Sequence, residues 1–268
     1  MTNRIKHKVG LAVSPLLLIV MMACGNTTDD QSVSETGDSL MKKGQYEQAI
    51  EKFDKAIKLN PDEVANYASR GAAFNMLRKY KRAIKEYDEV IKFDPKNPDA
   101  HGNRGYAYAN LGDFQTALRD YNEAIRLNPQ FAFAYNERGS VYHKLGQYER
   151  AVQDFDQAIR LDPQFAFAYS NRGFSYNKLG LYKQAIQDLD KVISLNPGYS
   201  GAYFNRGTSY TKLGLYEEAI QDYNEAIQLD NEDAKGYYNR GVVYQILGQG
   251  DKSESDKKRA CELDSKYC

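Results

Sequence analysis

The sequence predicts an all-α solenoid of seven tandem helix-turn-helix repeats, each 34 residues long. Three observations predict it. First, one glycine recurs every 34 residues, at Gly37, Gly71, Gly105, Gly139, Gly173, Gly207 and Gly241. Second, an alanine follows this glycine by twelve residues in six repeats, at Ala49, Ala83, Ala117, Ala151, Ala185 and Ala219. Third, a proline closes the first five repeats, at Pro61, Pro95, Pro129, Pro163 and Pro197. A fixed period of this length is typical of repeat architectures.

Each repeat predicts two amphipathic helices joined by a short turn. In the fifth repeat, Tyr169, Gly173 and Tyr176 fall on one face of the first helix. The facing stripe on the second helix consists of Ala185, Leu189, Val192 and Ile193. Gly173 lets the two helices approach closely, Gly180 ends the first helix, and Pro197 ends the second. A single helix pair cannot bury its apolar face alone, so the repeats must stack.

When the repeats are aligned, residues at equivalent positions form columns. The columns of glycine, alanine and proline resemble the tetratricopeptide repeat (TPR) family, over residues 30–267 and without insertions. The repeats begin at residues 30, 64, 98, 132, 166, 200 and 234. The resemblance implies a right-handed α-solenoid whose first helices line a concave groove for an extended peptide or a partner helix. The domain therefore comprises residues 30–268, and its last repeat is cap-like. That repeat has polar or small residues where inner repeats are apolar, at Gly250, Ser253, Glu254 and Lys257.

Residues 1–23 predict a signal peptide, because a short basic start precedes an uncharged run over residues 9–23. That run is too short to cross a bilayer as a helix. Ala23, Cys24 and Gly25 resemble the lipobox of bacterial lipoproteins, which implies cleavage before Cys24 and lipidation of its thiol. Gly25 favours the outer membrane in that family. The alternatives are an ordinary secretory signal or an uncleaved anchor. Residues 24–29 predict a polar tether, and the QSVSE that follows Asp30 has the same polar character.

An arginine stands directly before the repeat glycine in six repeats, and an acid follows it by sixteen residues. The pairs are Arg70 and Glu86, Arg104 and Asp120, Arg138 and Asp154, Arg172 and Asp188, Arg206 and Asp222, and Arg240 and Asp256. The first repeat has Thr36 and Lys52 instead, so arginine and acid are lost together. We expect a salt bridge inside each repeat. The alternative is that both groups are merely solvated.

Composition argues against several function classes. Lys and Arg number 36 against 36 Asp and Glu, which disfavours nucleic acid as a partner. The three histidines are His7, His101 and His143, and they share no column, so we expect no metal site and no cofactor. We expect no enzymatic activity and no small-molecule substrate either. Cys261 and Cys268 predict a disulfide in an oxidising compartment; the alternative is a buried Cys261 and a free Cys268.

The family's groove implies which side chains contact a partner. An asparagine column, interrupted by Glu137, consists of Asn103, Asn171, Asn205 and Asn239. Aromatic candidates are Phe133, Phe167, Phe174, Phe204, Tyr106 and Tyr238. A basic column consists of Lys144, Lys178 and Lys212. Carboxamides can clasp a peptide backbone and exposed aromatics are hot-spot candidates. The alternatives are helix-surface asparagines, aromatics buried between repeats, and lysines that only stabilise helix C-termini.

Together these patterns predict a non-enzymatic scaffold or adaptor that is lipid-anchored in the bacterial envelope. We expect it to face the periplasm from the outer membrane and to bind one or more envelope proteins. Two alternatives remain at this point. One is a self-associating structural envelope protein, and the other is a pilotin-like assembly factor for a pilus or secretion system.

Overall fold

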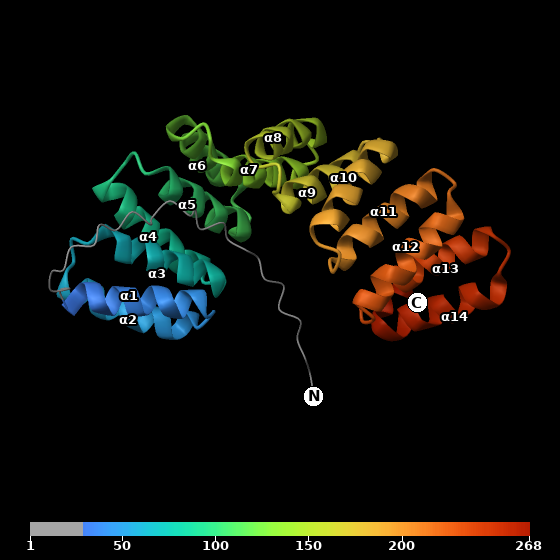
Figure 1. Cartoon of the computed structure of the whole chain (residues 1–268), viewed down its shortest axis with the longest axis horizontal. Helices are drawn as coiled ribbons and strands as arrows, with labels where there is room; N and C mark the ends of the chain where they lie inside the picture. The colour runs from blue at the N-terminus through green and yellow to red at the C-terminus, as the bar shows by residue number, and fades with distance from the viewer. Residues whose placement is uncertain (1–28) are drawn as a thin grey trace. The chain divides into compact units, whose positions relative to one another are not determined.

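The computed structural model describes residues 29–268, and the predicted signal peptide and Cys24 lie outside the described residues. Within residues 29–268 the chain forms fourteen α-helices and one short 3₁₀ helix, and no strand (Figure 1). The helices form seven consecutive pairs, as the 34-residue period predicts. None of the helices in this part of the chain is long and apolar enough to cross a membrane. The pairs fall into two compact units, which divide after Pro95.

The first unit contains two helix pairs. They are α1 (Asp29–Lys42) with α2 (Tyr46–Leu59), and α3 (Val64–Met76) with α4 (Tyr80–Phe93). Helix α1 begins at Asp29, so the polar QSVSE stretch belongs to a helix and not to a tether, which corrects that expectation. Asp29 and Asp30 lie in the first turn of α1, where their negative charges interact favourably with the positive end of the helix dipole. Ser34 Oγ also donates a hydrogen bond to Asn66 Oδ1 of α3 at 2.7 Å.

The second unit contains five helix pairs. They are α5 (Pro98–Leu111) with α6 (Phe114–Leu127), α7 (Ala132–Lys144) with α8 (Tyr148–Leu161), α9 (Ala166–Lys178) with α10 (Tyr182–Leu195), α11 (Ser200–Lys212) with α12 (Tyr216–Leu229), and α13 (Ala234–Ile246) with α14 (Gly250–Leu263). The 3₁₀ helix η1 (Ser265–Tyr267) follows α14. Each first helix contacts its own second helix and the first helix of the next repeat.

The repeat glycine lets the two helices of a pair approach closely. At Gly173 an added Cβ would lie 3.2 Å from Leu189 Cγ and 3.4 Å from the Ala185 carbonyl oxygen. Ala185, Leu189 and Val192 are buried in this contact, as the sequence predicts. Gly180 has a φ of +76°, in the left-handed region, and stands in the turn where glycine ends a helix without strain.

The cores connect successive repeats. One cluster joins Tyr121 and Ala124 of α6 to Ala134 and Val141 of α7, so the second helix of one repeat packs on the first helix of the next. This packing buries the apolar face that a lone pair would expose. In α14 the buried residues are Ser253, Asp256 and Ala260, which fits the small and polar residues of a terminal repeat.

Candidate protein-interaction face

The six arginines lie next to the acids sixteen residues later. The shortest contacts of Arg70, Arg104, Arg138, Arg172, Arg206 and Arg240 with these acids are 2.6, 2.7, 2.7, 2.6, 2.7 and 2.8 Å. In five of them the guanidinium donates to both carboxylate oxygens, and Arg172 does so with Nε and Nη2 at 2.8 and 2.6 Å. The Asp188 side chain is only 6% exposed. Each ion pair therefore joins the two helices of one repeat.

Sequence reasoning missed the second partner of these arginines. Arg172 Nη1 also donates to Asp156 Oδ1 at 2.6 Å, sixteen residues before it and in the preceding repeat. Arg70 and Arg206 bind Asp54 and Asp190 in the same way. The corresponding residues for Arg138 and Arg240 are Asn122 and Asn224. The sequence does contain a signal for these contacts: an acid or amide recurs two residues after the position of the paired acid, at Asp54, Asn122, Asp156, Asp190 and Asn224. The arginine column thus links neighbouring repeats as well.

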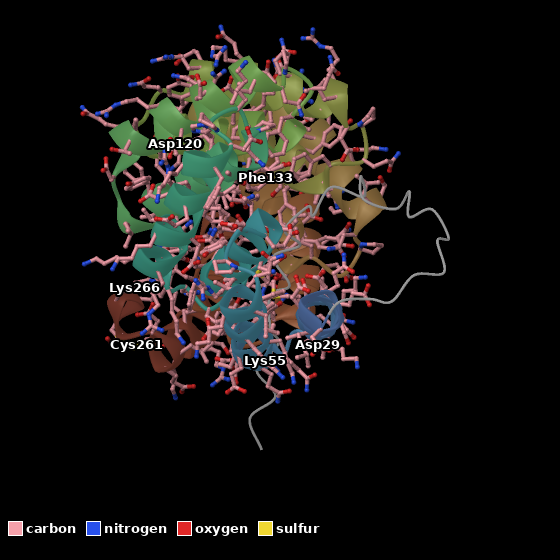
Figure 2. The ribbon with its side chains drawn as sticks, turned by 90° about the vertical axis from the view of Figure 1, so that its left-hand side faces the viewer. Asp29, Lys55, Asp120, Phe133, Cys261 and Lys266 are labelled. Carbon is pink, nitrogen blue, oxygen red and sulfur yellow. A yellow bond between two sulfur atoms is a disulfide. The ribbon has the colours of Figure 1, made fainter. Side chains whose placement is uncertain are left out.

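We call the surface formed by α5, α7, α9, α11 and α13 the first-helix face of the second unit. Phe167 and Phe174 on this face are 45% and 40% exposed. Phe133, labelled in Figure 2, stands at the start of α7 and is half-buried. Its ring centroid lies 6.4 Å from that of Tyr106. Half-buried Phe204 lies beside Tyr223. These rings are therefore neither fully solvated nor fully buried.

The predicted asparagine column makes unequal contacts. Asn103 Nδ2 donates to the Asp99 carbonyl of its own helix at 2.9 Å. Asn171 Nδ2 donates across to Asn136 Oδ1 at 3.1 Å and to Ser140 Oγ at 3.3 Å. The side-chain amide of Asn205 makes no hydrogen bond with any residue in the range 29–268. Asn205 therefore has its full hydrogen-bonding capacity available.

A cavity of about 480 Å³ opens beside Asn205. Phe174, Phe204 and Ile227 supply its apolar lining, and Asn171 and Asn205 supply carboxamides. Gly201 also lines it, at the repeat position where the two preceding repeats carry Phe133 and Phe167. The Tyr199 ring, which also lines the cavity, lies against Gly201, because an added Cβ there would be 2.9 Å from Tyr199 Cζ. Charged residues at the cavity are Asp230, Asp233 and Lys235.

The remaining candidates lie near the ends of the face. The lysine column, Lys144, Lys178 and Lys212, is exposed. Each lysine is the last residue of its helix, where a positive charge interacts favourably with the negative end of the helix dipole. Tyr238 packs on Tyr267 of η1, with ring centroids 4.8 Å apart.

The two described histidines have different surroundings. His101 is buried, with Nδ1 3.6 Å from Asp120 Oδ1. His143 Nδ1 lies 2.8 Å from Ser175 Oγ, and its ring stacks on Phe174 at 4.7 Å. Burial, together with Lys178, lowers the pKa of His143. No group of three metal-ligating side chains occurs within residues 29–268.

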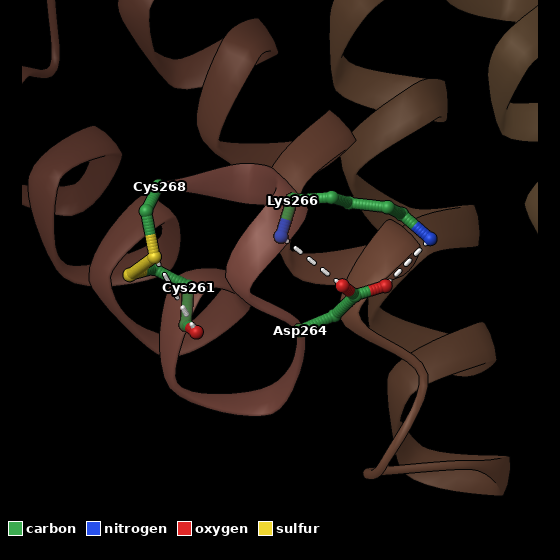
Figure 3. The surroundings of a disulfide bond; sticks show 4 residues. All are labelled: Cys261, Asp264, Lys266 and Cys268. Atoms are coloured by element: carbon green, nitrogen blue, oxygen red, sulfur yellow. Dashed lines mark hydrogen bonds and ion pairs between the residues drawn. A yellow bond between two sulfur atoms is a disulfide. The ribbon is translucent and has the colours of Figure 1, made fainter.

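Cys261 and Cys268 are joined by a disulfide, with their Cα atoms 4.7 Å apart (Figure 3). The bond ties the end of η1 back to α14. Between the two cysteines, Lys266 Nζ lies 2.6 Å from Asp264 Oδ2, and the Lys266 amide donates to Asp264 Oδ1 at 3.1 Å (Figure 3). The last turn of the chain is therefore fixed by a covalent and an ionic contact.

Tandem helix pairs with a 34-residue period define an α-helical repeat protein. A family model described as TPR repeat matches residues 37–77, 78–112, 139–180 and 207–248. Models described as tetratricopeptide repeat match residues 98–131, 166–199, 120–153, 189–221 and 234–267. The chain therefore belongs to the tetratricopeptide repeat family. The repeats make it a protein-interaction scaffold, of a kind that is typically not enzymatic.

Solved structures show the same fold. A tetratricopeptide repeat protein from Parabacteroides merdae ATCC 43184 has a TM-score of 0.65 at 24% identity, over 88% of this chain and 93% of that one. Pseudomonas aeruginosa PilF has a TM-score of 0.68 at 19% identity, over 75% and 92%. A chain of the APC/C hetero-tetramer Cut9–Hcn1 reaches 0.74 at 18% identity, over 85% of this chain and only 45% of its own length. No curated protein matches the chain significantly.

Proposed function

We propose that the second unit binds an extended segment of a partner protein on its first-helix face. The observation that carries this proposal is the cavity of about 480 Å³ between Phe174, Phe204 and Asn205. Phe174, Phe204 and Ile227 supply apolar parts of its wall, and the Asn205 amide beside them has no partner within residues 29–268. Apolar walls with a few convergent polar groups are typical of binding sites. A carboxamide can both donate to and accept from a peptide backbone.

The test is a peptide selection on the full-length chain in detergent. Random peptides displayed on phage are selected on the wild type and on the double variant Phe174→Ala, Asn205→Ala. We expect the wild type to enrich peptides that the variant does not retain. The control is Phe93→Ala with Asn196→Ala, which removes an exposed phenylalanine and an exposed asparagine outside the cavity lining. Equal enrichment on all three proteins would contradict the proposal. Circular dichroism establishes that each variant folds.

We further propose that Cys24 carries a lipid and that the scaffold works at a bacterial envelope membrane, facing the periplasm. The support is the basic start, the uncharged run of residues 9–23 and the Ala23–Cys24–Gly25 junction. Cys24→Ala should abolish incorporation of labelled palmitate and release the chain from the membrane fraction. Unchanged labelling in that variant would contradict the anchor, while the binding face would be unaffected.

A further inference from the structure

Glu137 is an unusual carboxylate on the first-helix face. It stands in α7 at the repeat position that four other repeats give to asparagine. Its Oε1 accepts a hydrogen bond from Asn136 Nδ2 at 2.8 Å, but no cation among residues 29–268 forms an ion pair with it. The buried acids of the second unit, such as Asp154 and Asp188, are instead paired with arginine. Burial raises the pKa of Glu137 to about 7, against the opposing effects of Asn136 and Lys144.

A buried hydroxyl next to Glu137 also lacks a partner. The Tyr121 side chain is fully buried in α6, and its hydroxyl makes no hydrogen bond to any described residue. Tyr121 packs in one core cluster with Ala134 and Val141 of α7, which lie about one helical turn on either side of Glu137. Burial, and next the charge of Glu137, raise the pKa of Tyr121. An unsatisfied buried hydroxyl is unfavourable unless something binds it.

The equivalent tyrosine three repeats later shows what is missing. The Tyr223 hydroxyl lies 3.2 and 3.4 Å from the hydroxyls of Thr211 and Thr208. Burial raises the pKa of Tyr223, and hydrogen bonding with Thr208, Thr211 and Asn239 opposes this effect. At the corresponding positions around Tyr121 stand Ala109, Tyr106 and Glu137. The two threonine hydroxyls are thus replaced by a methyl group and an aromatic ring, and the amide by a carboxylate.

Aromatic rings complete the surroundings. Phe133 lies one helical turn before Glu137 on the same face of α7. The Phe133 ring centroid is 6.4 Å from that of Tyr106 and 5.7 Å from that of Phe131. Aromatic faces attract cations and accept the methylene stem of a long cationic side chain.

We propose that Glu137, the Tyr121 hydroxyl and the rings of Tyr106 and Phe133 form a subsite for a cationic side chain, lysine or arginine, of the bound partner segment. This inference rests on the proposed function of the same face. An ammonium or guanidinium group brings several donors and no acceptor. It therefore suits an unpaired carboxylate and a hydroxyl that can accept. A neutral side chain would leave the ionised Glu137 unpaired in a poorly solvated place.

The same peptide selection, run near pH 8, tests the subsite. We expect peptides enriched on the wild type to share a lysine or arginine at one position, and this preference to disappear on Glu137→Gln. A selected peptide and its versions with lysine, arginine or norleucine at that position are then synthesised. Glu137→Gln should weaken binding of the cationic versions by at least about 10-fold and leave the norleucine version within about 3-fold. The lysine and arginine versions show which cation the subsite prefers.

The matched control is Glu149→Gln, which removes an exposed carboxylate of α8 and should bind all versions like the wild type. Enriched peptides without a cationic preference, or a preference that persists in Glu137→Gln, would overturn the subsite and leave the proposed function standing. If the wild type enriches no peptide at all, the proposed function is contradicted and the subsite falls with it.

Discussion

At the scale of single residues, the unpaired Glu137 should make stability depend on pH. A glutamate outside the fold has a pKa near 4.5, and burial raises that of Glu137 to about 7. As pH rises, the Glu137 carboxyl therefore ionises in the unfolded chain before it does so in the folded chain. The stability that the protonated Glu137 contributes is present below about pH 4.5 and is lost between about pH 4.5 and about pH 7. Glu137→Gln should match the wild type near pH 4 and exceed it near pH 8 by on the order of 2 kcal/mol. Urea unfolding across this range measures the difference.

A ligand cation should reverse this shift. The free protein holds a proton on most Glu137 side chains at pH 6, whereas a bound lysine or arginine favours the ionised form. Binding of the selected cationic peptide at pH 6 should thus release roughly one proton. Calorimetry in two buffers of different ionisation enthalpy counts it. The opposing influences on the pKa of Glu137 are its hydrogen bond with Asn136 and the charge of Lys144, and the charge of Glu137 in turn raises the pKa of Tyr121 in α6. No proton release on binding would speak against the ion pair.

Part of this site was predictable from the sequence, because Glu137 interrupts an asparagine column whose period is fixed. The hydroxyl of Tyr121 was not predictable. Its column also contains Phe155 and Leu189, so it predicts only a core position. Whether the hydroxyl is satisfied depends on residues in three different helices, and only the fold brings these together.

At the scale of the helices, the two acids bound by Arg172 should differ in their contributions to stability. The Asp188 side chain is 6% exposed, whereas that of Asp156 is 42% exposed, although both bind Arg172 at 2.6 Å. Losing a buried charge partner is costly, while an exposed pair contributes little. Asp188→Asn should lower the free energy of unfolding by about 2–4 kcal/mol and Asp156→Asn by less than about 1 kcal/mol. If urea unfolding shows equal losses of stability for the two variants, burial does not determine how much each acid contributes.

Two glycines in different helices, Gly173 of α9 and Gly250 of α14, should respond in opposite directions to replacement by alanine. At Gly173 an added Cβ meets Leu189 and the Ala185 backbone at 3.2 and 3.4 Å, so Gly173→Ala should destabilise by about 1–3 kcal/mol despite the better helix propensity. At Gly250 nothing lies within 4 Å, so Gly250→Ala should stabilise α14 by up to about 1 kcal/mol. Thermal unfolding of both variants measures the contrast. A stable Gly173→Ala protein would mean that the helix pair can separate at little cost.

At the scale of the whole molecule, the fold was predictable and the links between repeats were only partly so. A 34-residue period fixes which residues face each other inside a repeat, so the helix pairs and their arginine–acid contacts follow from one column comparison. The same comparison did not predict contacts between residues of neighbouring repeats. It therefore missed the contacts of Arg70, Arg172 and Arg206 with the preceding repeat. It also assigned the polar QSVSE stretch to a tether, because composition alone does not show that α3 covers that stretch.

A protein in which each repeat contacts only its neighbours should confine a disturbance to one end. The Cys261–Cys268 disulfide closes a short loop, and removing it should lower local stability by about 2 kcal/mol. Cys268→Ser also frees η1, and with it Tyr267 from Tyr238. We expect faster amide hydrogen exchange in α14, η1 and α13, and unchanged exchange in α5–α8. Stability in such chains is a sum of repeat and nearest-neighbour terms. Exchange that accelerates equally from α5 to α14 would show that the second unit unfolds as one cooperative body.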